Sequence, residues 1–254
     1  MLTRIDLNSD MGERETPEGR AIDADMMLLI TSVNIACGGH AGTPDLMRRT
    51  AQLAAQQGVA IGAHPGLPDS DHFGRRERHI PAADIEALVI SQIETLAEVM
   101  ARDYLTLTHV KPHGALYNMA ARNSDVARAI VHAVQSVDRT FLLYALAGSE
   151  LVKAGQVAGL RVVQEAFADR AYRADGTLVQ RSEAEALLKT EQDIRQRLRH
   201  VITGAVMSVD GASVPIQADT LCLHADTPHA VPLARMIRHE LEAVGIRLAA
   251  VHHA

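Results

Sequence analysis

Short apolar runs rich in β-branched residues alternate with longer segments of helical periodicity along almost the whole chain. This alternation is typical of parallel βαβ units, because a helix carries the chain back across the sheet before the next parallel strand begins. The predicted strands are residues 3–7, 31–36, 59–63, 104–110, 140–146, 160–166, 219–224 and 246–251. The predicted helices are residues 23–30, 44–57, 82–102, 124–137, 149–156, 183–202 and 229–244. The pattern therefore predicts an α/β fold with a parallel sheet and not a β-sandwich.

The chain length and one interruption of this pattern indicate the domain organisation. The 254 residues match the roughly 250 residues of one α/β barrel, so we expect a single domain over residues 1–254. The stretch 167–218 interrupts the alternation with the turn signals Asp175-Gly176 and Asp210-Gly211, and we interpret it as a hairpin-containing insertion. Seven or eight strands predict a closed or nearly closed (β/α) barrel, although a doubly wound open sheet gives much the same order of elements.

Three helix starts carry capping signals. Thr43 and Thr227 each precede a proline, which suits the first helical position, and Ser182 with Glu185 forms a capping-box pattern. These signals predict that a helix begins directly after each of the three residues.

Composition narrows the classes of partner. Hydrophobic residues make up 47% of the chain, which is enough for a folded core. The net charge is −6 and no cluster of Lys or Arg is present, which argues against binding to nucleic acid or anionic membranes. A small molecule or another protein is therefore the favoured partner. A homo-oligomer is left open. We find no export signal and no apolar run of about 18 residues, and we expect a cytoplasmic protein with Cys37 and Cys222 reduced.

Several common catalytic motifs are missing from the sequence. It contains no GxxxxGK[ST] phosphate-binding loop, no GxSxG elbow, no CxxC pair and no HExxH helix. The remaining chemistry is acid, base and amide chemistry built from Asp, Glu, His and Lys. If ATP takes part, it is bound in another way or by a partner.

Polar or titratable residues follow nearly every predicted strand. They are Asn8, Asp10, His40, His64, Lys111, His113, Glu165 and His224. Because the carboxyl ends of parallel strands share one rim of a barrel, we expect these side chains to converge on a cavity there. We interpret the histidines of helices and the chain end as surface residues and leave two loop histidines undecided. The first group is His132, His200, His239, His252 and His253, and the second is His72 and His79.

The segment NIACGGHAGTP at residues 34–44 ends a strand, turns through Gly38-Gly39 and opens a helix. Two interpretations stay open for it. Consecutive glycines before a helix N-terminus favour an anion site, and they are equally typical of a tight turn that needs positive φ.

Several motifs in order resemble the LamB/YcsF family over essentially the whole chain. They are DLNSDMGE at 6–13, NIACGGHAG at 34–42, IGAHPGLPD at 61–69, FGRR at 73–76, VKPHGALYN at 110–118, EAFADRAYRADGTLVQR at 165–181 and CLHADTP at 222–228. The family usually has an aromatic residue at Gly39, an acidic one at Thr43, Ser-Tyr at Gly66-Leu67 and glycine at Ala225. We expect these departures to reshape the mouth of the pocket and to affect substrate preference.

The resemblance implies a seven-stranded, distorted (β/α) barrel similar to that of polysaccharide deacetylases. It also implies a hydrolase activity that opens 5-oxoproline, a cyclic amide, to L-glutamate with ATP hydrolysis, together with B and C partner subunits. ATP, bound by this chain or by the partners, is the expected cofactor, and a divalent metal is a second candidate.

For this reaction we expect a general base, a proton donor and a group that stabilises negative charge on the rim. Asp10 or His64 is the candidate base, His113 the proton donor and Lys111 the charge-stabilising group, with Glu165 in the same catalytic set. The candidate substrate-binding residues are Asn8, Asn34, His40, Arg75, Arg76, Asn118, Asp169, Arg170 and His224.

Alternative interpretations of these residues stay open. Asp10, His40 and His64 are also candidate metal ligands. The adjacent Arg75 and Arg76 also suit a solvated loop or a subunit contact, and Glu165 and Asp169 also suit structural salt bridges to Arg170 or Arg173. Two other functions are weighed: a stand-alone metal-dependent amidase or deacetylase, and a non-catalytic lactam-binding or scaffolding subunit.

Overall fold

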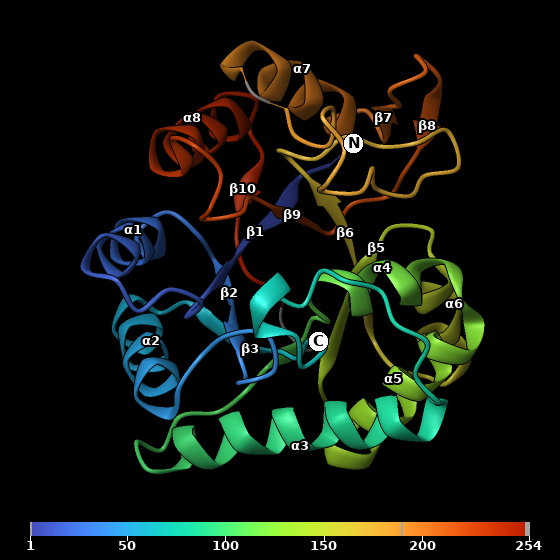
Figure 1. Cartoon of the computed structure of the whole chain (residues 1–254). Coiled ribbons are helices and arrows are strands. Elements are labelled where there is room, and N and C mark those ends of the chain that lie inside the picture. Colours follow the sequence, from blue (N-terminus) through green and yellow to red (C-terminus); the bar gives the residue numbers. More distant parts are fainter. Residues whose placement is uncertain (1, 189, 252–254) are drawn as a thin grey trace.

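A computed structural model describes residues 2–188 and 190–251 and shows a closed parallel barrel (Figure 1). The ring follows chain order and closes where the last strand pairs with β1. Its strands are β1 (Arg4–Met11), β2 (Ser32–Ala36), β3 (Ala60–His64), β4 (His109–Val110), β5 (Leu142–Leu146), β6 (Val162–Phe167) and β9 (Thr220–Cys222). A further strand, β10 (Arg247–Leu248), pairs with the amino-terminal end of β1 outside the ring. The predicted seven-stranded barrel is confirmed, and the open sheet is wrong because β9 bonds to both β6 and β1.

The helices surround the barrel and cover the outer face of its strands (Figure 1). They are α1 (Pro17–Met27), α2 (Pro44–Gln57), α3 (Ala82–Ala101), α4 (Gly114–Arg122), α5 (Ser124–Val137), α6 (Glu150–Val157), α7 (Glu191–Ile202) and α8 (Ala230–Ala243). Each exposes one face and buries an apolar one, as in α3, where Ile85, Val89, Ile93 and Leu96 are fully buried. None of the helices within the described residues combines the length and the apolar character of a membrane span.

Several predicted boundaries are wrong for local reasons. β1 continues to Met11, so Asn8 and Asp10 lie within the strand and do not follow it. The predicted strand 104–110 shrinks to two residues, because Tyr104 has a φ of 56° and lies 95% exposed in a turn. The first helix begins six residues early at Pro17, where the Thr16 hydroxyl accepts a hydrogen bond from the Gly19 amide.

Two of the three capping predictions also fail. Thr43 does cap α2, accepting from the Leu46 amide. Ser182 begins no helix, and Thr190 instead caps α7 by accepting from the Asp193 amide. The Thr227 hydroxyl donates to Asp169, so α8 begins only after His229. The helix α4 was missed: only residues 111–113 separate it from β4, and only Asn123 separates it from α5.

The inside of the barrel is polar in its middle, and its amino-terminal end combines apolar side chains with the buried Asp6 carboxylate, which accepts hydrogen bonds from Ser32, Tyr144 and Thr220. Near that end, Leu142, Tyr144 and Val163 pack together against Val251. Above them, side chains from neighbouring strands form a hydrogen-bonded layer: Asn34 donates to the Asn8 side-chain oxygen at 2.8 Å and accepts from the His109 Nε2–H at 2.9 Å. Gly62 makes room for this layer, since a Cβ there would lie 2.2 Å from the His109 ring.

The stretch between β6 and β9 forms a cover over one side of the rim. It contains α7 and an antiparallel hairpin of β7 (Ala205–Met207) and β8 (Ser213–Pro215), whose connecting residues include Asp210-Gly211. Before α7, Tyr172 bridges Leu178 in antiparallel fashion across the Asp175-Gly176 turn. The segment from Arg170 to Ser182 thereby lies against the rim and contributes to the cavity described below.

We predict that His109 makes the protein less stable in mild acid. Burial lowers the pKa of His109 in the folded protein to about 3, whereas its ordinary pKa, which applies to the unfolded chain, is 6.5. Between these two values the unfolded chain takes up a proton at His109 and the folded protein does not. The free energy of unfolding then falls by about 1.4 kcal/mol per pH unit from this group as the pH drops from about 6.5 towards 3. Denaturant titrations of wild type and His109→Gln between pH 4 and 7 measure this, and identical pH slopes would contradict it.

Candidate active site at the carboxyl ends of the strands

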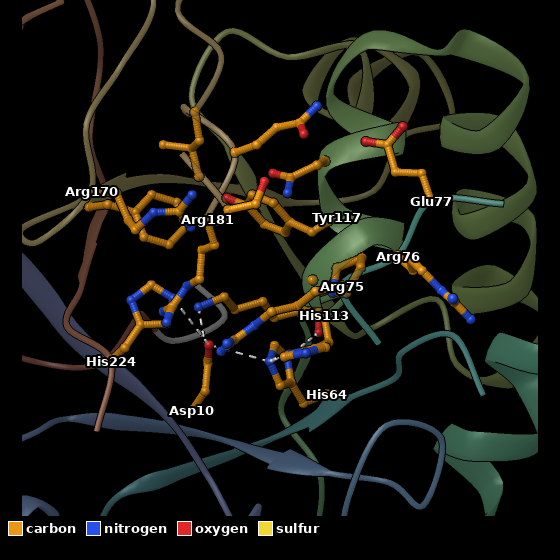
Figure 2. Close-up of a pocket in the computed structure, with 18 of the residues that line it drawn as sticks. Asp10, His64, Arg75, Arg76, Glu77, His113, Tyr117, Arg170, Arg181 and His224 are labelled. Atoms are coloured by element: carbon orange, nitrogen blue, oxygen red, sulfur yellow. Dashed lines mark hydrogen bonds and ion pairs between the residues drawn. The ribbon is translucent and has the colours of Figure 1, made fainter. Parts of the chain in front are cut away.

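A cavity of about 510 Å³ opens at the carboxyl ends of the barrel strands (Figure 2). Nine of the predicted site residues line it. They are Asp10, His64, Arg75, Arg76, Lys111, His113, Asn118, Arg170 and His224. Residues separated by more than two hundred positions therefore meet at one rim, as parallel strands require.

Lys111 is the buried positive charge of the site, with a side chain only 2% exposed. Its Nζ lies 3.0 Å from Asp10 Oδ1 and 2.9 Å from Glu165 Oε1, and it also donates to Asn8 Oδ1 at 3.1 Å. Burial by itself lowers the pKa of an ammonium, but the Asp10 and Glu165 carboxylates outweigh it and raise the pKa of Lys111 well above its usual range. Lys111 is therefore charged at neutral pH.

Asp10 presents one carboxylate oxygen to this network and the other to the cavity. Its Oδ1 accepts from Lys111 and from Asn34 at 2.8 Å, while Oδ2 lies 3.3 Å from His64 Nε2 and 3.8 Å from His224 Nε2. Burial acts to raise the pKa of Asp10, but His64 and Lys111 overcome this and hold it well below its usual range. The outcome is an ionised carboxylate at the base of the cavity (Figure 2).

Five predicted site residues are absent from the cavity lining, and their side chains are buried beneath it. They are Asn8, Asn34, His40, Glu165 and Asp169. Asn8, Asn34 and Glu165 fill the narrow interior of the seven-stranded barrel, whereas His40 and Asp169 lie in the loops after β2 and β6. Glu165 illustrates the point, since it is fully buried and bonds Lys111, Asn8 and, at 2.7 Å, the Tyr117 hydroxyl.

Asp169 holds His224 in place from below the wall. Its carboxylate oxygens each lie 3.1 Å from His224 Nδ1, and Thr227 donates to the same group. No ion pair joins Asp169 or Glu165 to Arg170 or Arg173 among the described residues. Arg170 donates to the Ala186 and Val179 carbonyls, and Arg173 pairs with Glu183. Because Asp169 binds Nδ1 of His224, the other ring nitrogen, Nε2, faces Asp10.

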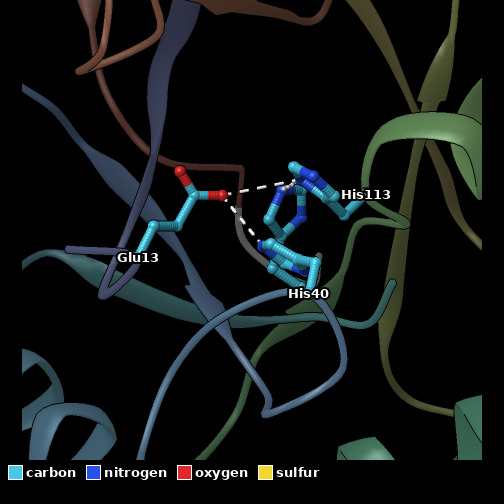
Figure 3. A group of neighbouring side chains, drawn as sticks. Glu13, His40 and His113 are labelled. Carbon is cyan, nitrogen blue, oxygen red and sulfur yellow. Dashed lines mark hydrogen bonds and ion pairs between the residues drawn. The ribbon is translucent and has the colours of Figure 1, made fainter. Parts of the chain in front are cut away.

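Glu13, His40, His64 and His113 form a second cluster beside Asp10 (Figure 3), here called the histidine cluster. His40 and His113 stack with ring centroids 3.5 Å apart, and His40 Nε2 lies 2.9 Å from Glu13 Oε1. Burial, followed by the neighbouring histidine rings, lowers the pKa of His113 well below its usual range. Sequence reasoning missed Glu13, although it stands in the DLNSDMGE motif directly after β1.

Arginines form the positive side of the cavity. Arg75 and Arg181 both bond Asp226 Oδ2 at 2.9 Å, while Arg170, 4% exposed, forms no ion pair with any described carboxylate. Burial lowers the pKa of Arg170 to about 10, which leaves it charged at neutral pH. Arg181 was missed, although it ends the EAFADRAYRADGTLVQR motif, and its Nη2 is buried without a partner among the described residues.

Arg76 is the exception among the arginines. It lies at the edge of the cavity with a side chain 56% exposed, pairs with Asp69 at 3.5 Å and points away from Asp10 in Figure 2. The solvated-loop interpretation therefore fits Arg76 better than a role in binding substrate.

The glycine loop before α2 is a packed turn. Gly38 has a φ of 88° and its amide donates to the Ala41 carbonyl at 2.8 Å, while a Cβ on Gly39 would meet Gln92 and the Gly66 carbonyl oxygen at 2.5 Å.

The departures at residues 39, 43, 66, 67 and 225 all lie outside the cavity lining. A side chain at Gly66 would nevertheless press on His113, which lines the cavity, because its Cβ would lie 3.2 Å from the His113 Cβ.

Five other histidines lie apart from this chemistry, whereas Cys222 accepts a hydrogen bond from Lys111 at 3.2 Å. His72, His79, His132 and His239 are exposed and His200 is half-buried, whereas His252 and His253 lie outside the described residues. Cys37 and Cys222 are both buried free thiols.

The comparison with known proteins decides the family. Residues 5–254 match the model of the LamB/YcsF family. The chain belongs to this family. It is 49% identical over 247 residues to the A subunit of 5-oxoprolinase from Bordetella pertussis, covering 97% of this chain and 98% of that protein. It is 47% identical over 249 residues to the protein of the same name from Bacillus subtilis, covering 98% of this chain and 97% of that one.

A solved structure supports the same relationship. The lactam utilization protein from Thermus thermophilus superposes with a TM-score of 0.88 at 40% identity, covering 98% of this chain and all of that one. The LamB/YcsF barrel described here is thus shared along the full length of a relative.

We predict that Lys111→Met lowers the free energy of unfolding by about 3–5 kcal/mol, because Asp10 and Glu165 are left as uncompensated buried charges. Lys153→Met is the matched control, since its exposed pair with Glu150 on α6 contributes under about 1 kcal/mol. Urea titrations of both variants at pH 7 measure the difference. Equal losses in the two variants would contradict the role given to Lys111.

Proposed function

We propose that this chain is the component of a 5-oxoprolinase that opens 5-oxoproline to L-glutamate, acting with B and C subunits that couple the reaction to ATP hydrolysis. One observation carries the proposal: an ionised Asp10 lies at the base of a cavity whose other side presents Arg170 and Arg181. The names of the relatives, which refer to 5-oxoprolinase and to lactam utilization, agree with it.

The arginine side of the cavity suits the carboxylate of 5-oxoproline. Arg170 is charged and buried without a carboxylate partner among the described residues, and the Nη2 of Arg181 has unused donor capacity. A bound carboxylate would compensate both groups with charge-assisted hydrogen bonds. The lactam ring then extends from the arginines towards Asp10 and His224.

Asp10 is the general base in this proposal, and water is the nucleophile that attacks the lactam carbonyl carbon. Lys111 does not face the substrate oxygen directly, because its ammonium already donates to Asp10, Glu165 and Asn8. Its role is to keep Asp10 ionised and in place. Glu165 is a positioning residue that acts through Lys111.

We assign the proton donor to the ring nitrogen to His224 in place of His113. The Nε2 of His113 donates to the Phe73 carbonyl at 2.9 Å, and its Nδ1 faces His64 at 3.0 Å, so both nitrogens are engaged. His224 lines the cavity, and its Nδ1 is held by Asp169 while its Nε2 remains towards Asp10. This is the arrangement of an oriented acid beside a base.

ATP enters through the partners in this proposal. An unstrained lactam is a poor electrophile, and phosphorylating its oxygen would make the ring carbon more electrophilic. Water then adds to that carbon, the C–N bond breaks as the ring nitrogen takes up a proton, and a second water hydrolyses the resulting acyl phosphate to L-glutamate and phosphate. The chain has no GxxxxGK[ST] motif, so the B and C subunits are assigned the ATP-dependent step. Arg75 at the cavity mouth, paired with Asp226, is placed to meet a phosphate group.

Glutamate release from 5-oxoproline tests the proposal when it is measured for this chain alone and with its B and C partners, each with and without ATP. We expect turnover only for the complete complex with ATP. Turnover by the single chain that a chelator abolishes would support a metal-dependent amidase instead.

Within the complete complex, Asp10→Asn is expected to lower kcat by about 10²–10⁴-fold, because the amide cannot accept the proton from water. Asp25→Asn, on the exposed face of α1, is the matched control and should leave kcat unchanged. Undiminished turnover by Asp10→Asn, with the variant chain still incorporated in the complex, would favour a scaffolding role.

Arg181→Gln is expected to raise KM for 5-oxoproline by about 10–100-fold, as one charge-assisted hydrogen bond is lost. The KM for 2-pyrrolidinone, which lacks the carboxylate, should not change if that ring is turned over. Arg195→Gln, a surface residue paired with Glu191, is the control. Steady-state kinetics of the complex measure both effects, and an equal change for the two lactams would count against a carboxylate at Arg181.

A further inference from the structure

We propose that Glu13, His40, His64 and His113 bind one divalent transition-metal ion of the zinc class. Glu13 follows β1, His40 follows β2, His64 ends β3 and His113 follows β4, so consecutive strands of the barrel each deliver one side chain to the same point. One donor atom from each residue lies within 4.8 Å of the other three.

The hydrogen atoms of the two central imidazoles are already assigned by their backbone contacts. His64 Nδ1 lies 2.7 Å from the Lys111 carbonyl and His113 Nε2 lies 2.9 Å from the Phe73 carbonyl, and a carbonyl only accepts. A neutral imidazole has one N–H, so the remaining nitrogens, His64 Nε2 and His113 Nδ1, carry lone pairs. These two nitrogens face each other at 3.0 Å in the buried interior. Two lone pairs at this distance repel unless a positive species lies between or beside them.

The spacing of the cluster favours a metal ion over a shared proton. A proton can join only two of the donors, whereas tetrahedral bonds of 2.0–2.1 Å place four donors about 3.3 Å apart. Glu13 Oε1 lies 2.9 Å from His40 Nε2 and 3.5 Å from His113 Nδ1, and His64 Nε2 lies 3.0 Å from His113 Nδ1. These three donor–donor distances lie on both sides of the tetrahedral value. Three imidazoles and one carboxylate form a donor set typical of zinc and cobalt.

The contacts behind the donors point in the same direction. Histidines that bind metals donate their other ring N–H to a carbonyl or carboxylate, which fixes the tautomer and aims the ligand nitrogen. His64 and His113 both have this arrangement, with two different backbone carbonyls. His40 differs from these two: binding through Nε2 would leave its proton on Nδ1, which is buried and has no hydrogen-bond partner among the described residues.

A neighbouring cluster of Asp10, Cys222 and His224 is a weaker candidate for a metal site. The Lys111 ammonium lies 3.0 Å from Asp10 Oδ1 and 3.2 Å from Cys222 Sγ, so a positive charge already occupies that position. The metal ligands suggested by sequence, Asp10, His40 and His64, are therefore revised by exchanging Asp10 for Glu13 and His113.

The proposed ion would lie at the wall of the cavity, because Glu13, His64 and His113 all line it. His64 Nε2 is 3.3 Å from Asp10 Oδ2, which places a Lewis acid next to the proposed base when the site is loaded. The inference goes beyond the proposed function, since metal binding is measured without substrate, ATP or partner subunits.

The test uses the full chain after dialysis against a chelator, titrated with ZnCl₂ by calorimetry and with CoCl₂ by visible absorption. We expect one equivalent of Zn²⁺ with a Kd in the micromolar range or tighter, a tetrahedral Co²⁺ spectrum and a rise in Tm on loading. His64→Gln and Glu13→Gln are each expected to weaken binding about 100-fold or more. His132→Gln, exposed on α5, is the matched control and should bind as wild type does.

Wild-type protein that is folded and binds neither Zn²⁺ nor Co²⁺ overturns the proposal, whatever the variants do. Binding that survives in folded His64→Gln and Glu13→Gln also overturns it, because the ion must then lie elsewhere. Circular dichroism of each variant establishes that it is folded. Failure of metal binding leaves the proposed lactam hydrolysis intact, since Asp10 and His224 lie outside the four ligands.

Discussion

The Lys111 ammonium lies inside the barrel, where an isolated charge would be strongly disfavoured, and the surrounding strands are arranged to compensate it. Asp10 on β1 and Glu165 on β6 bind it directly, and Asn8 and Cys222 contribute further contacts from β1 and β9. These contacts link β4 to strands on the other side of the ring. The Lys111–Asp10 ion pair also keeps Asp10 ionised. The same interaction therefore stabilises the barrel interior and sets the charge at the base of the cavity.

The strand register explains why the polar groups stack in layers. Alternate residues of β1 point inward, so Asn8 and Asp10 occupy successive levels, and Asp10 lies in register with Asn34 of β2. The lower side chain, Asn8, is fully engaged by internal hydrogen bonds with Asn34 and Glu165. Only the upper level reaches the cavity, which is why residues two positions apart on one strand have different roles.

Two kinds of chemistry then meet at the cavity from different parts of the chain. The first four strands supply Asp10 and the histidine cluster, and the cover between β6 and β9 supplies Arg170 and Arg181. In the proposed binding mode, a carboxylate-bearing lactam lies between them, with its anionic end at the arginines and its amide near Asp10 and His224. The cover is also the part of the chain whose helix boundaries were hardest to predict, because its backbone is organised by bridges and loop contacts and not by a periodic pattern.

The amino-acid sequence by itself determined the class of fold and the location of the site. The alternation of apolar runs and helical segments reflects local periodicity and burial, and the polar residues at strand ends marked the rim because parallel strands share one direction. Tertiary structure alone decided which of those residues reach the cavity. Glu165 and Asn34 form hydrogen bonds inside the narrow ring, whereas Glu13 and Arg181 reach the cavity from loops. Ring closure and strand register decide where a side chain points at the end of a strand. They also decide which hydrogen-bonding groups remain unpaired inside the barrel, and no local sequence pattern encodes either.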